Sequence, residues 1–398
     1  MSISHDRPGT VPWRFIALLA LVSATGPFAM QIFLPALPSI ARDFAVEPGV
    51  AQLTLSAAMA AIAVSTLAYG PLSDRFGRRP VLLAGLALFL IGSVACVLAR
   101  TVEALVVARI VQAAGGAAGM VLARAMARDL HDATGAAIVI SRLTMVMVLA
   151  PMVAPVIGGV FHDAFGWRSI FILVAALAVL VFVLGWLRVE ESREPVRVGS
   201  GGLLRGFVEL LGTKRFVVLM LYPAFSSMIF FGFISGAPYV MAEILDRPAT
   251  EYGLWFMLVA GSYILGNFGA TRLTRRFGSL NLMVAGMVIA VAGACLLILV
   301  QSLGGLSPAT LFLPVALTQI GQGLGLPNAQ AAALDAFPAR AGTASALTGF
   351  TQMLAAGAAS QAVGQLQDDS AWPLIILLTI AAIAALTVSL VARTMARG

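Results

Sequence analysis

The chain has 398 residues, of which 60% are hydrophobic and only 11% are charged, and its net charge is +7. A soluble domain carries about 25% charged residues, so this composition excludes an ordinary soluble globular protein. The basic residues are spread over short connectors and form no separate basic domain, which argues against a nucleic-acid partner.

Twelve apolar runs follow one another, each long enough to cross about 30 Å of hydrocarbon as a helix. They predict an all-α integral membrane protein with twelve transmembrane helices, because a barrel would show short alternating segments. The first run is longer than the about 7–15 apolar residues of a cleaved signal peptide. The expected spans are 14–36, 52–72, 80–99, 103–123, 138–161, 167–187, 216–240, 252–271, 280–301, 309–334, 342–365 and 372–392.

One long polar connector separates the first six runs from the last six. We therefore expect an N-terminal six-helix half at 1–187, a linker at 188–215 and a C-terminal six-helix half at 216–398. Within the linker, LLRGFVELLG at 203–212 predicts a short amphipathic helix at the membrane surface.

The distribution of Lys and Arg predicts the orientation. Of the 25 basic residues, four fall in the connectors of one face, and all the others outside the spans fall on the face that holds both termini. Those four are Arg42, Arg100, Arg168 and Arg247. By the positive-inside rule, the N and C termini and the linker are expected to be cytoplasmic.

The connector after the second run reads GPLSDRFGRRP at 70–80. Its arginines can be topology anchors, but anchoring requires neither Asp74 nor this order of glycines. A related stretch, LTRRFGSL at 273–280, follows the second run of the other half and aligns with LSDRFGRR at 72–79. Such an internal repeat is typical of transporters that bind their substrate between two halves.

These residues resemble a known family. GPLSDRFGRRP closely resembles motif A of the major facilitator superfamily, whose general form is G-x-L-a-D-r-x-G-r-k/r. RIVQAAGGAAG at 109–119 is similar to the superfamily's fourth-helix motif, and APMVAPVIGG at 150–159 to its fifth-helix antiporter motif. FLPALPSI at 33–40 together with RAMARDL at 124–130 resembles the bicyclomycin and chloramphenicol resistance branch of drug:proton antiporters. The resemblance covers nearly the whole chain.

In that superfamily the acid of motif A lies near the cytoplasmic end of the eleventh helix, which implies a conformational latch. The latch residues implied here are Gly70, Asp74, Arg75, Gly77 and Arg78. A carboxylate close to a helix N-terminus at 341–344 would be stabilised by the helix dipole and would favour one access state. Simple topology anchoring is the alternative.

Arg109 is the only charge well inside a run, where it costs about 2.5 kcal/mol or more unless it faces a cavity or a partner. We expect Arg109 in the substrate cavity, with Gln112 as its neighbour one turn away. The alternative is an arginine that pairs with backbone carbonyls for packing.

The fifth run contains two prolines and two glycines. Interior prolines bend a helix, and glycines let another helix approach closely. We expect a kinked helix that seals against the other half, with generic small-residue packing as the alternative. The residues are Pro151, Pro155, Gly158 and Gly159.

In-span amides and an aromatic residue complete the expected cavity and coupling site. They are Gln31, Phe230, Asn267, Gln319 and Asn328. Ordinary core or lipid-facing packing accounts for most of them equally well. Gln31 departs from the resemblance, because the branch reads T-D-M-Y-L-P where this chain reads MQIFLP at 30–35. Its acid is implicated in proton coupling, and glutamine cannot titrate. Coupling has either moved to an acid near a cavity mouth, such as Glu103 or Asp335, or been lost.

We therefore expect a secondary active transporter, not an enzyme, that exports small amphipathic compounds such as drugs by alternating access coupled to protons. An uncoupled facilitator or importer of a metabolite is the first alternative, and a polytopic membrane enzyme is the second. No Walker A motif and no metal-ligand spacing occur in the sequence, so no cofactor and no metal are expected. The expected partners are a small-molecule substrate, protons and the lipid bilayer, for a monomer in the bacterial inner membrane.

Overall fold

The computed structural model describes residues 13–130, 132–192, 201–337 and 340–396, and within these ranges every regular element is a helix. The middle of the predicted linker, 193–200, lies outside the described residues. The long helices are α1 (Trp13–Gln31), α3 (Pro48–Phe76), α4 (Arg78–Leu98), α5 (Val102–Asp129), α6 (Ala133–Phe165), α7 (Trp167–Arg188), α9 (Lys214–Tyr239), α10 (Ala249–Phe277), α11 (Ser279–Ser302), α12 (Pro308–Asp335), α13 (Ala341–Leu366) and α14 (Trp372–Met395). The short elements are η1 (Leu34–Ala36), α2 (Leu37–Asp43), α8 (Gly201–Leu211) and η2 (Val240–Ile244).

Each predicted run corresponds to one long helix, and the all-α membrane fold is confirmed. Among the described residues, eleven helices are long and apolar enough to cross a membrane. The remaining long helix, α13, has 26 residues but is rich in Gly, Ser, Thr and Gln. The facing ends of α5 and α6 extend beyond the predicted spans, to Asp129 and from Ala133, because charges there do not stop a helix outside the hydrocarbon.

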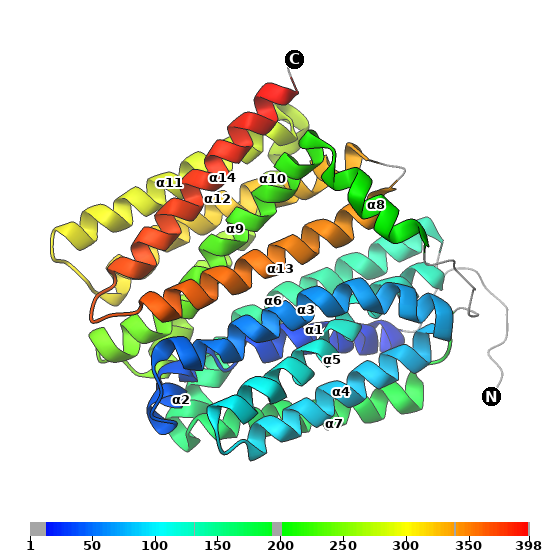
Figure 1. Cartoon of the computed structure of the whole chain (residues 1–398), viewed down its shortest axis with the longest axis horizontal. Coiled ribbons are helices and arrows are strands. Elements are labelled where there is room, and N and C mark those ends of the chain that lie inside the picture. Colours follow the sequence, from blue (N-terminus) through cyan, green and yellow to red (C-terminus); the bar gives the residue numbers. More distant parts are fainter. Residues whose placement is uncertain (1–12, 131, 193–200, 338–339, 397–398) are drawn as a thin grey trace.

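The helices form two bundles that lie side by side, α1–α7 and α9–α14 (Figure 1). Long helices pair across the seam between them, α3 with α13 and α6 with α10. We call the end where α3 begins the sealed end, because α3 and α13, and α6 and α10, pack closely there. We call the opposite end, with the 70–80 connector, α8, the start of α1 and the end of α14, the basic end (Figure 1).

Two glycines show the internal repeat in the backbone. Gly77 ends α3 and precedes α4 with φ of +94°, and Gly278 ends α10 and precedes α11 with φ of +80°. Each amide donates to the carbonyl four residues earlier, at 3.0 Å for Gly77 and 2.9 Å for Gly278. A side chain is disfavoured at such φ values, so the shared Phe-Gly pair builds the same tight turn in both halves.

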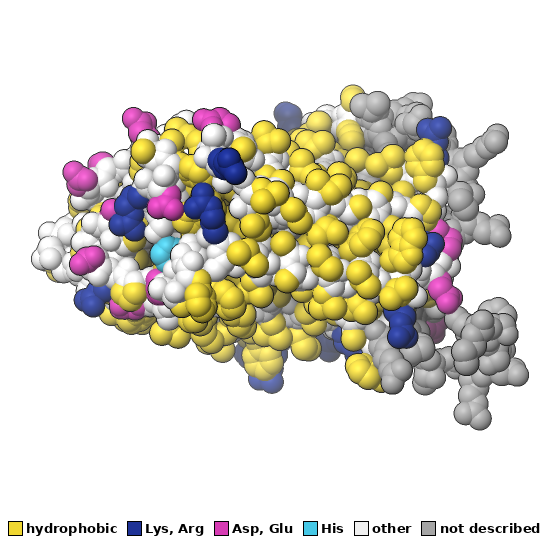
Figure 2. All heavy atoms as spheres, turned by 90° about the horizontal axis from the view of Figure 1, so that it is seen from below, with side chains coloured by type: hydrophobic (Ala, Val, Ile, Leu, Met, Phe, Trp, Pro, Cys, Tyr) yellow, Lys and Arg dark blue, Asp and Glu magenta, His cyan; other side chains and the backbone are white. Residues whose placement is uncertain are grey.

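The surface has the pattern of a membrane protein. Hydrophobic side chains form a broad band between the two ends of the face in Figure 2, while charged side chains gather mainly at those ends. Large apolar residues such as Ile91, Leu265 and Ile380 are 60–65% exposed in helix interiors. In water this exposure would be costly, and in a bilayer it places these side chains in hydrocarbon.

The predicted amphipathic helix of the linker is present as α8. It packs against α13 and the start of α9, where Leu210 joins a small core with Phe216 and Leu347. Glu209 forms an ion pair with Arg340 before α13. Leu210 and Phe207 of α8 therefore pack on the second bundle, while Val208 and Leu211 stay exposed.

Candidate functional site

Arg109 lies inside the first bundle and is 1% exposed. Its guanidinium donates to the carbonyls of Thr54 at 3.3 Å and Ala29 at 3.2 Å, and to the side-chain oxygen of Gln112. Its Cζ lies 4.0 Å from the centre of the Phe33 ring. The side chain therefore ties α1 and α3 to α5, and no described carboxylate pairs with it.

The contacts of Gln112 continue this network into α4. Its Nε2 donates to Ser93 Oγ at 2.9 Å, and that hydroxyl donates to the Phe89 carbonyl at 2.6 Å. The predicted proximity of Arg109 and Gln112 is thus present as a hydrogen bond. Because backbone carbonyls and an amide disperse the charge without neutralising it, the bundle keeps a positive centre in a low-dielectric interior.

Two of the predicted amides keep buried polar atoms without a partner. Gln31 is 6% exposed, and its Oε1 has no hydrogen-bond partner among the described residues. Gln319 is fully buried on α12, and neither its Oε1 nor its Nε2 has one. A buried polar group without a partner costs about 1–3 kcal/mol, so these two amides are candidates to bind a polar ligand group.

The other predicted residues of the second bundle have different surroundings. Asn328 accepts from Thr274 Oγ1 at 2.8 Å and donates to the Leu324 carbonyl at 2.9 Å, so its amide joins α12 to α10. Phe230 is half-buried, with its ring 5.1 Å from that of Phe231. Asn267 is also half-buried on α10, next to the tight crossing with α12. Asn328 therefore has a structural partner already, whereas Phe230 and Asn267 remain accessible.

The fifth-run motif lies at the sealed end, on α6. A side chain at Gly158 would overlap the Ile32 carbonyl oxygen. A Cβ at Gly159 would lie 2.6 Å from the Ala249 carbonyl oxygen of the other bundle, and one at Gly253 2.7 Å from the Pro155 carbonyl oxygen. Helix α6 continues through Pro151 and Pro155, and its glycines let its backbone touch both α1 and α10.

A carboxylate that the sequence analysis did not single out holds the same seam. Asp163 of α6 accepts from Thr250 N at 2.9 Å, Thr250 Oγ1 at 2.6 Å and Ala249 N at 3.3 Å. His162 contacts Asp163 through Nδ1 at 3.1 Å and Ser39 Oγ through Nε2 at 2.8 Å. Asp163 thus caps α10 from the opposite bundle, where the helix dipole favours a negative charge.

The second seam at the sealed end is also polar. Gln52 Nε2 donates to Ser360 Oγ at 2.6 Å, and Ser56 Oγ donates to Gln361 Oε1 at 2.7 Å. Gln361 in turn donates to the Gly49 carbonyl at 2.9 Å. These hydrogen bonds join α3 to α13. Every hydrogen bond found between the two described bundles lies at the sealed end.

The motif A residues form a cluster at the basic end, within the first bundle. Arg78 pairs with Asp74 at 2.8 Å and with Asp129 of α5 at 2.9 Å, and it is 6% exposed. Its backbone amide donates to Glu191 after α7 at 2.8 Å. Arg75 lies over the Phe76 ring, with its Cζ 5.1 Å from the ring centre. The described cluster therefore fastens α3, α4, α5 and the start of the linker to one another.

The implied contact between Asp74 and α13 is not made in this conformation. Among the described residues, no hydrogen bond or ion pair joins the motif A cluster to the second bundle. Gly77 supplies the tight turn, but no atom lies within 4 Å of a Cβ placed at Gly70. A latch across the two halves thus stays a prediction for another conformation.

Comparison with known proteins identifies the family. The model of the Major Facilitator Superfamily matches residues 19–360. Multidrug resistance protein D of Escherichia coli is 31% identical over 371 residues, which cover 92% of each chain. The bicyclomycin resistance protein homolog of Haemophilus influenzae is 30% identical over 367 residues, which cover 91% of each chain. The expected resemblance to drug-resistance members of this superfamily is confirmed.

Solved structures support the fold. A bacterial homolog of the human lysosomal transporter Spinster, in an inward-facing and occupied conformation, superposes with a TM-score of 0.75 over 98% of each chain. Its sequence is 18% identical. The family match and these relatives identify a multi-pass membrane transporter and not an enzyme.

Proposed function

Since the chain belongs to the Major Facilitator Superfamily, we propose that it is a monomeric exporter of small amphipathic compounds, including drugs, in the bacterial inner membrane. One observation carries this proposal: the described hydrogen bonds between the two bundles all lie at one end, as an alternating-access transporter requires in a state closed on one side. The printed names of its relatives, multidrug and bicyclomycin resistance proteins, support drug export.

The charge distribution supports the orientation of this state. The basic end carries most of the Lys and Arg residues, so we assign it and both termini to the cytoplasm. The sealed end then faces outward, and the structure corresponds to a state that takes up its substrate from the cytoplasm. We further propose the six-helix halves 1–187 and 216–398 as the units that move, with 188–215 as their linker.

The chemistry of the interior favours uncharged polar substrates over lipophilic cations. Arg109 is buried without a carboxylate partner, so a second cation nearby would meet repulsion in a low-dielectric region. Gln31 and Gln319 offer unpartnered amide atoms that can accept from hydroxyls and amides, and Gln319 can also donate to carbonyls. Phe230 adds an accessible aromatic surface.

Proton coupling is the finer part of the proposal. Gln31 occupies the position where the related antiporters have an acid, and the two alternative acids lie at opposite ends of the molecule. Glu103 is exposed at the sealed end, and Asp335 is exposed at the basic end of α12. The retained fifth-run motif, seated between α1 and α10, supports coupled exchange. An uncoupled facilitator is the second candidate, and the absence of an acid at Gln31 favours it.

Transport in proteoliposomes tests both candidates. A neutral amide-containing drug is added with and without an imposed pH gradient, and a lipophilic cation serves as the comparison substrate. Coupled export predicts accumulation against the drug's own gradient and proton release on drug addition. Equilibration of the drug down its own gradient, at a rate and final level that the pH gradient does not change, would support the facilitator instead. Transport of the cation and not of the neutral compound would refute the substrate class.

Substitution at Gln31 gives an independent test of coupling. If wild type has lost coupling, Gln31→Asp alone should gain pH-driven accumulation. Asn267→Asp is the control, because it also converts an amide within a span to an acid, at a half-buried position where Gln31 is buried. If both variants gain the same pH response, the position of Gln31 has no special role.

A further inference from the structure

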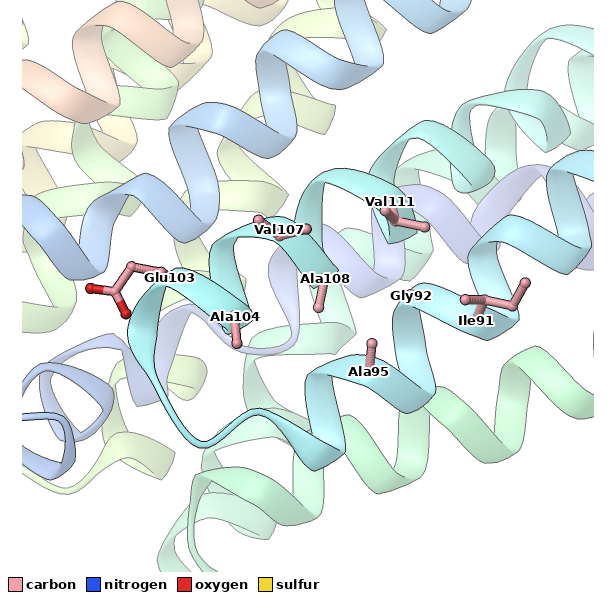
Figure 3. Close-up of a pocket in the computed structure, with 8 residues that line it drawn as sticks. All are labelled: Ile91, Gly92, Ala95, Glu103, Ala104, Val107, Ala108 and Val111. Atoms are coloured by element: carbon pink, nitrogen blue, oxygen red, sulfur yellow. The ribbon is translucent and has the colours of Figure 1, made fainter.

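The two halves share their internal packing. A Cβ at Gly92 of α4 would lie 2.6 Å from the Cα of Gln112 on α5, and Figure 3 shows this stretch of the two helices with Gly92 labelled. A Cβ at Gly293 of α11 would lie 2.9 Å from the amide nitrogen of Thr318 on α12. Because the third and fourth long helices of each half cross in the same way, helix ends in one half can be compared with those in the other.

The two seams between the bundles also correspond. Each seam joins the second long helix of one half to the fifth of the other, α3 to α13 and α10 to α6. At the sealed end, Ser56 of α3 and Thr250 of α10 mark the sides that face these seams, because they bond to α13 and α6. Asp74 follows Ser56 by 18 residues and Arg275 follows Thr250 by 25, which is about five and about seven helical turns. Asp74 and Arg275 therefore lie on the seam-facing sides of α3 and α10 at the basic end.

The charges on the two seams are reversed at the basic end. On the first seam, Asp74 lies in the last turn of α3, and Arg340 is the N-cap of α13. On the second seam, Arg275 lies in the last turn of α10, at the position that aligns with Asp74, and Asp132 is the N-cap of α6. Each seam thus has one acid and one base at this end, with the signs exchanged between the second helix and the fifth.

The two seams differ in whether these charges are already paired. Asp74 and Arg340 both have ion-pair partners on their own side of the seam. Arg275 and Asp132 are exposed, and neither forms an ion pair with another described residue. The Asp132 carboxylate accepts from the amide of Gly135 in its own helix, at 2.9 Å. Its second oxygen is therefore left to accept from a partner across the seam.

We propose that Arg275 and Asp132 form an ion pair when the basic end closes, as a second latch in which the signs of the motif A latch are exchanged. This inference rests on the alternating access of the proposed function. The helix dipole disfavours an arginine at the N-terminus of α6, so the attraction depends on the Asp132 carboxylate. The pair forms without the loss of another ion pair. It favours the state that is closed at the basic end and open at the sealed end.

Neutral variants test the second latch. Asp132→Asn keeps the start of α6 intact, because asparagine is as good an N-cap as aspartate. The readout is the alkylation, by an impermeant thiol reagent at the sealed face, of a cysteine placed at Met59, which is buried against α13. Asp132→Asn and Arg275→Gln should each slow this alkylation about 1.5- to 5-fold, as for an exposed ion pair. The double variant should be no slower than either single variant, because all three lose the same interaction.

Arg276→Gln is the matched control. It removes the same charge one residue further along α10, but Arg276 points about 100° away from the seam-facing side and lies over the Phe277 ring. Its alkylation rate at position 59 should equal that of the parent protein. If Arg275→Gln is no slower than Arg276→Gln, or if the effects of the two single variants add in the double variant, the second latch is refuted. If the cysteine is not alkylated even in the parent, the sealed end does not open, and the proposed function fails together with this inference.

Discussion

The sealed end should open more readily when Asp163 loses its charge. Asp163 accepts three hydrogen bonds from the first residues of α10, two of them at 2.6 and 2.9 Å. In asparagine one carboxylate oxygen becomes an NH2 group that cannot accept, so at least one of these hydrogen bonds is lost at a cost of about 0.5–1.5 kcal/mol, and loss of a charge at a helix N-terminus costs about 0.3–1 kcal/mol. The side chain is 31% exposed, so we take about 1–2 kcal/mol in total for Asp163→Asn.

That free energy changes the ratio of the two access states by about 5- to 30-fold, in favour of the state open at the sealed end. The shift can be read from the alkylation rate of a cysteine placed at Met59, which is fully buried beside Gly357 of α13. The two free native cysteines, Cys96 and Cys295, are replaced first. The reagent is impermeant and is applied at the sealed face.

Asp368→Asn is the matched control. It removes the same charge at the same end, but among the described residues the Asp368 carboxylate bonds only to Ser370 of its own connector. In the Asp368→Asn variant, the cysteine at position 59 should be alkylated at the same rate as in the parent protein that keeps both aspartates. If the cysteine at position 59 is alkylated no faster in Asp163→Asn than in Asp368→Asn, the contact of Asp163 with α10 does not keep the sealed end closed, and the reasoning fails.

Three further predictions concern other parts of the chain. Arg109→Ala and Arg109→Lys should both lose transport of the exported drug and lower the Tm, since lysine cannot reach three acceptors at once; normal transport by the alanine variant would leave a packing role only. Gly159→Val should slow transport and speed alkylation of the cysteine at position 59, because the valine side chain would overlap the Ala249 carbonyl. Gly349→Val is the control and should do neither, since nothing is found within 4 Å of a Cβ placed there. A cysteine near 195 should resist an impermeant thiol reagent outside intact cells and one near 368 should react; labelling of both would contradict the twelve-span topology.

The fold could be predicted because hydrocarbon imposes one rule on every span. A run of about 20 apolar residues must be a helix there, whatever its tertiary neighbours. The residues at which the helices begin and end could be predicted less well. Arg124 and Arg128 indicated a connector between 123 and 138, but α5 extends over both to Asp129 and α6 begins already at Ala133. Charge marks where the membrane ends and not where a helix ends.

The site could be predicted only where its partners are close in sequence. The hydrogen bond from Arg109 to Gln112 follows from helical spacing, and the structure contains it. The carbonyls of Ala29 and Thr54 have no side-chain signature, so their contact with Arg109 could not be predicted. Asp163 lies just after the end of one run and Thr250 just before the start of another, and only the pairing of α6 with α10 brings them together.

We propose that the motif A cluster and the sealed end contribute to one equilibrium between access states. In this conformation Arg78 holds Asp74, Asp129 and the linker together inside the first bundle, which leaves the Asp74 carboxylate only 33% exposed and already paired. A contact between Asp74 and α13 would therefore require Asp74 either to leave Arg78 or to interact with Arg78 and the N-terminus of α13 at the same time. If the latch forms, we expect the conformational change at the basic end to be an exchange of ion-pair partners, whose net free energy is smaller than that of a bond made from separated charges. Against so small a term, the about 1–2 kcal/mol of the Asp163 cap is large enough to decide which end of the molecule is closed.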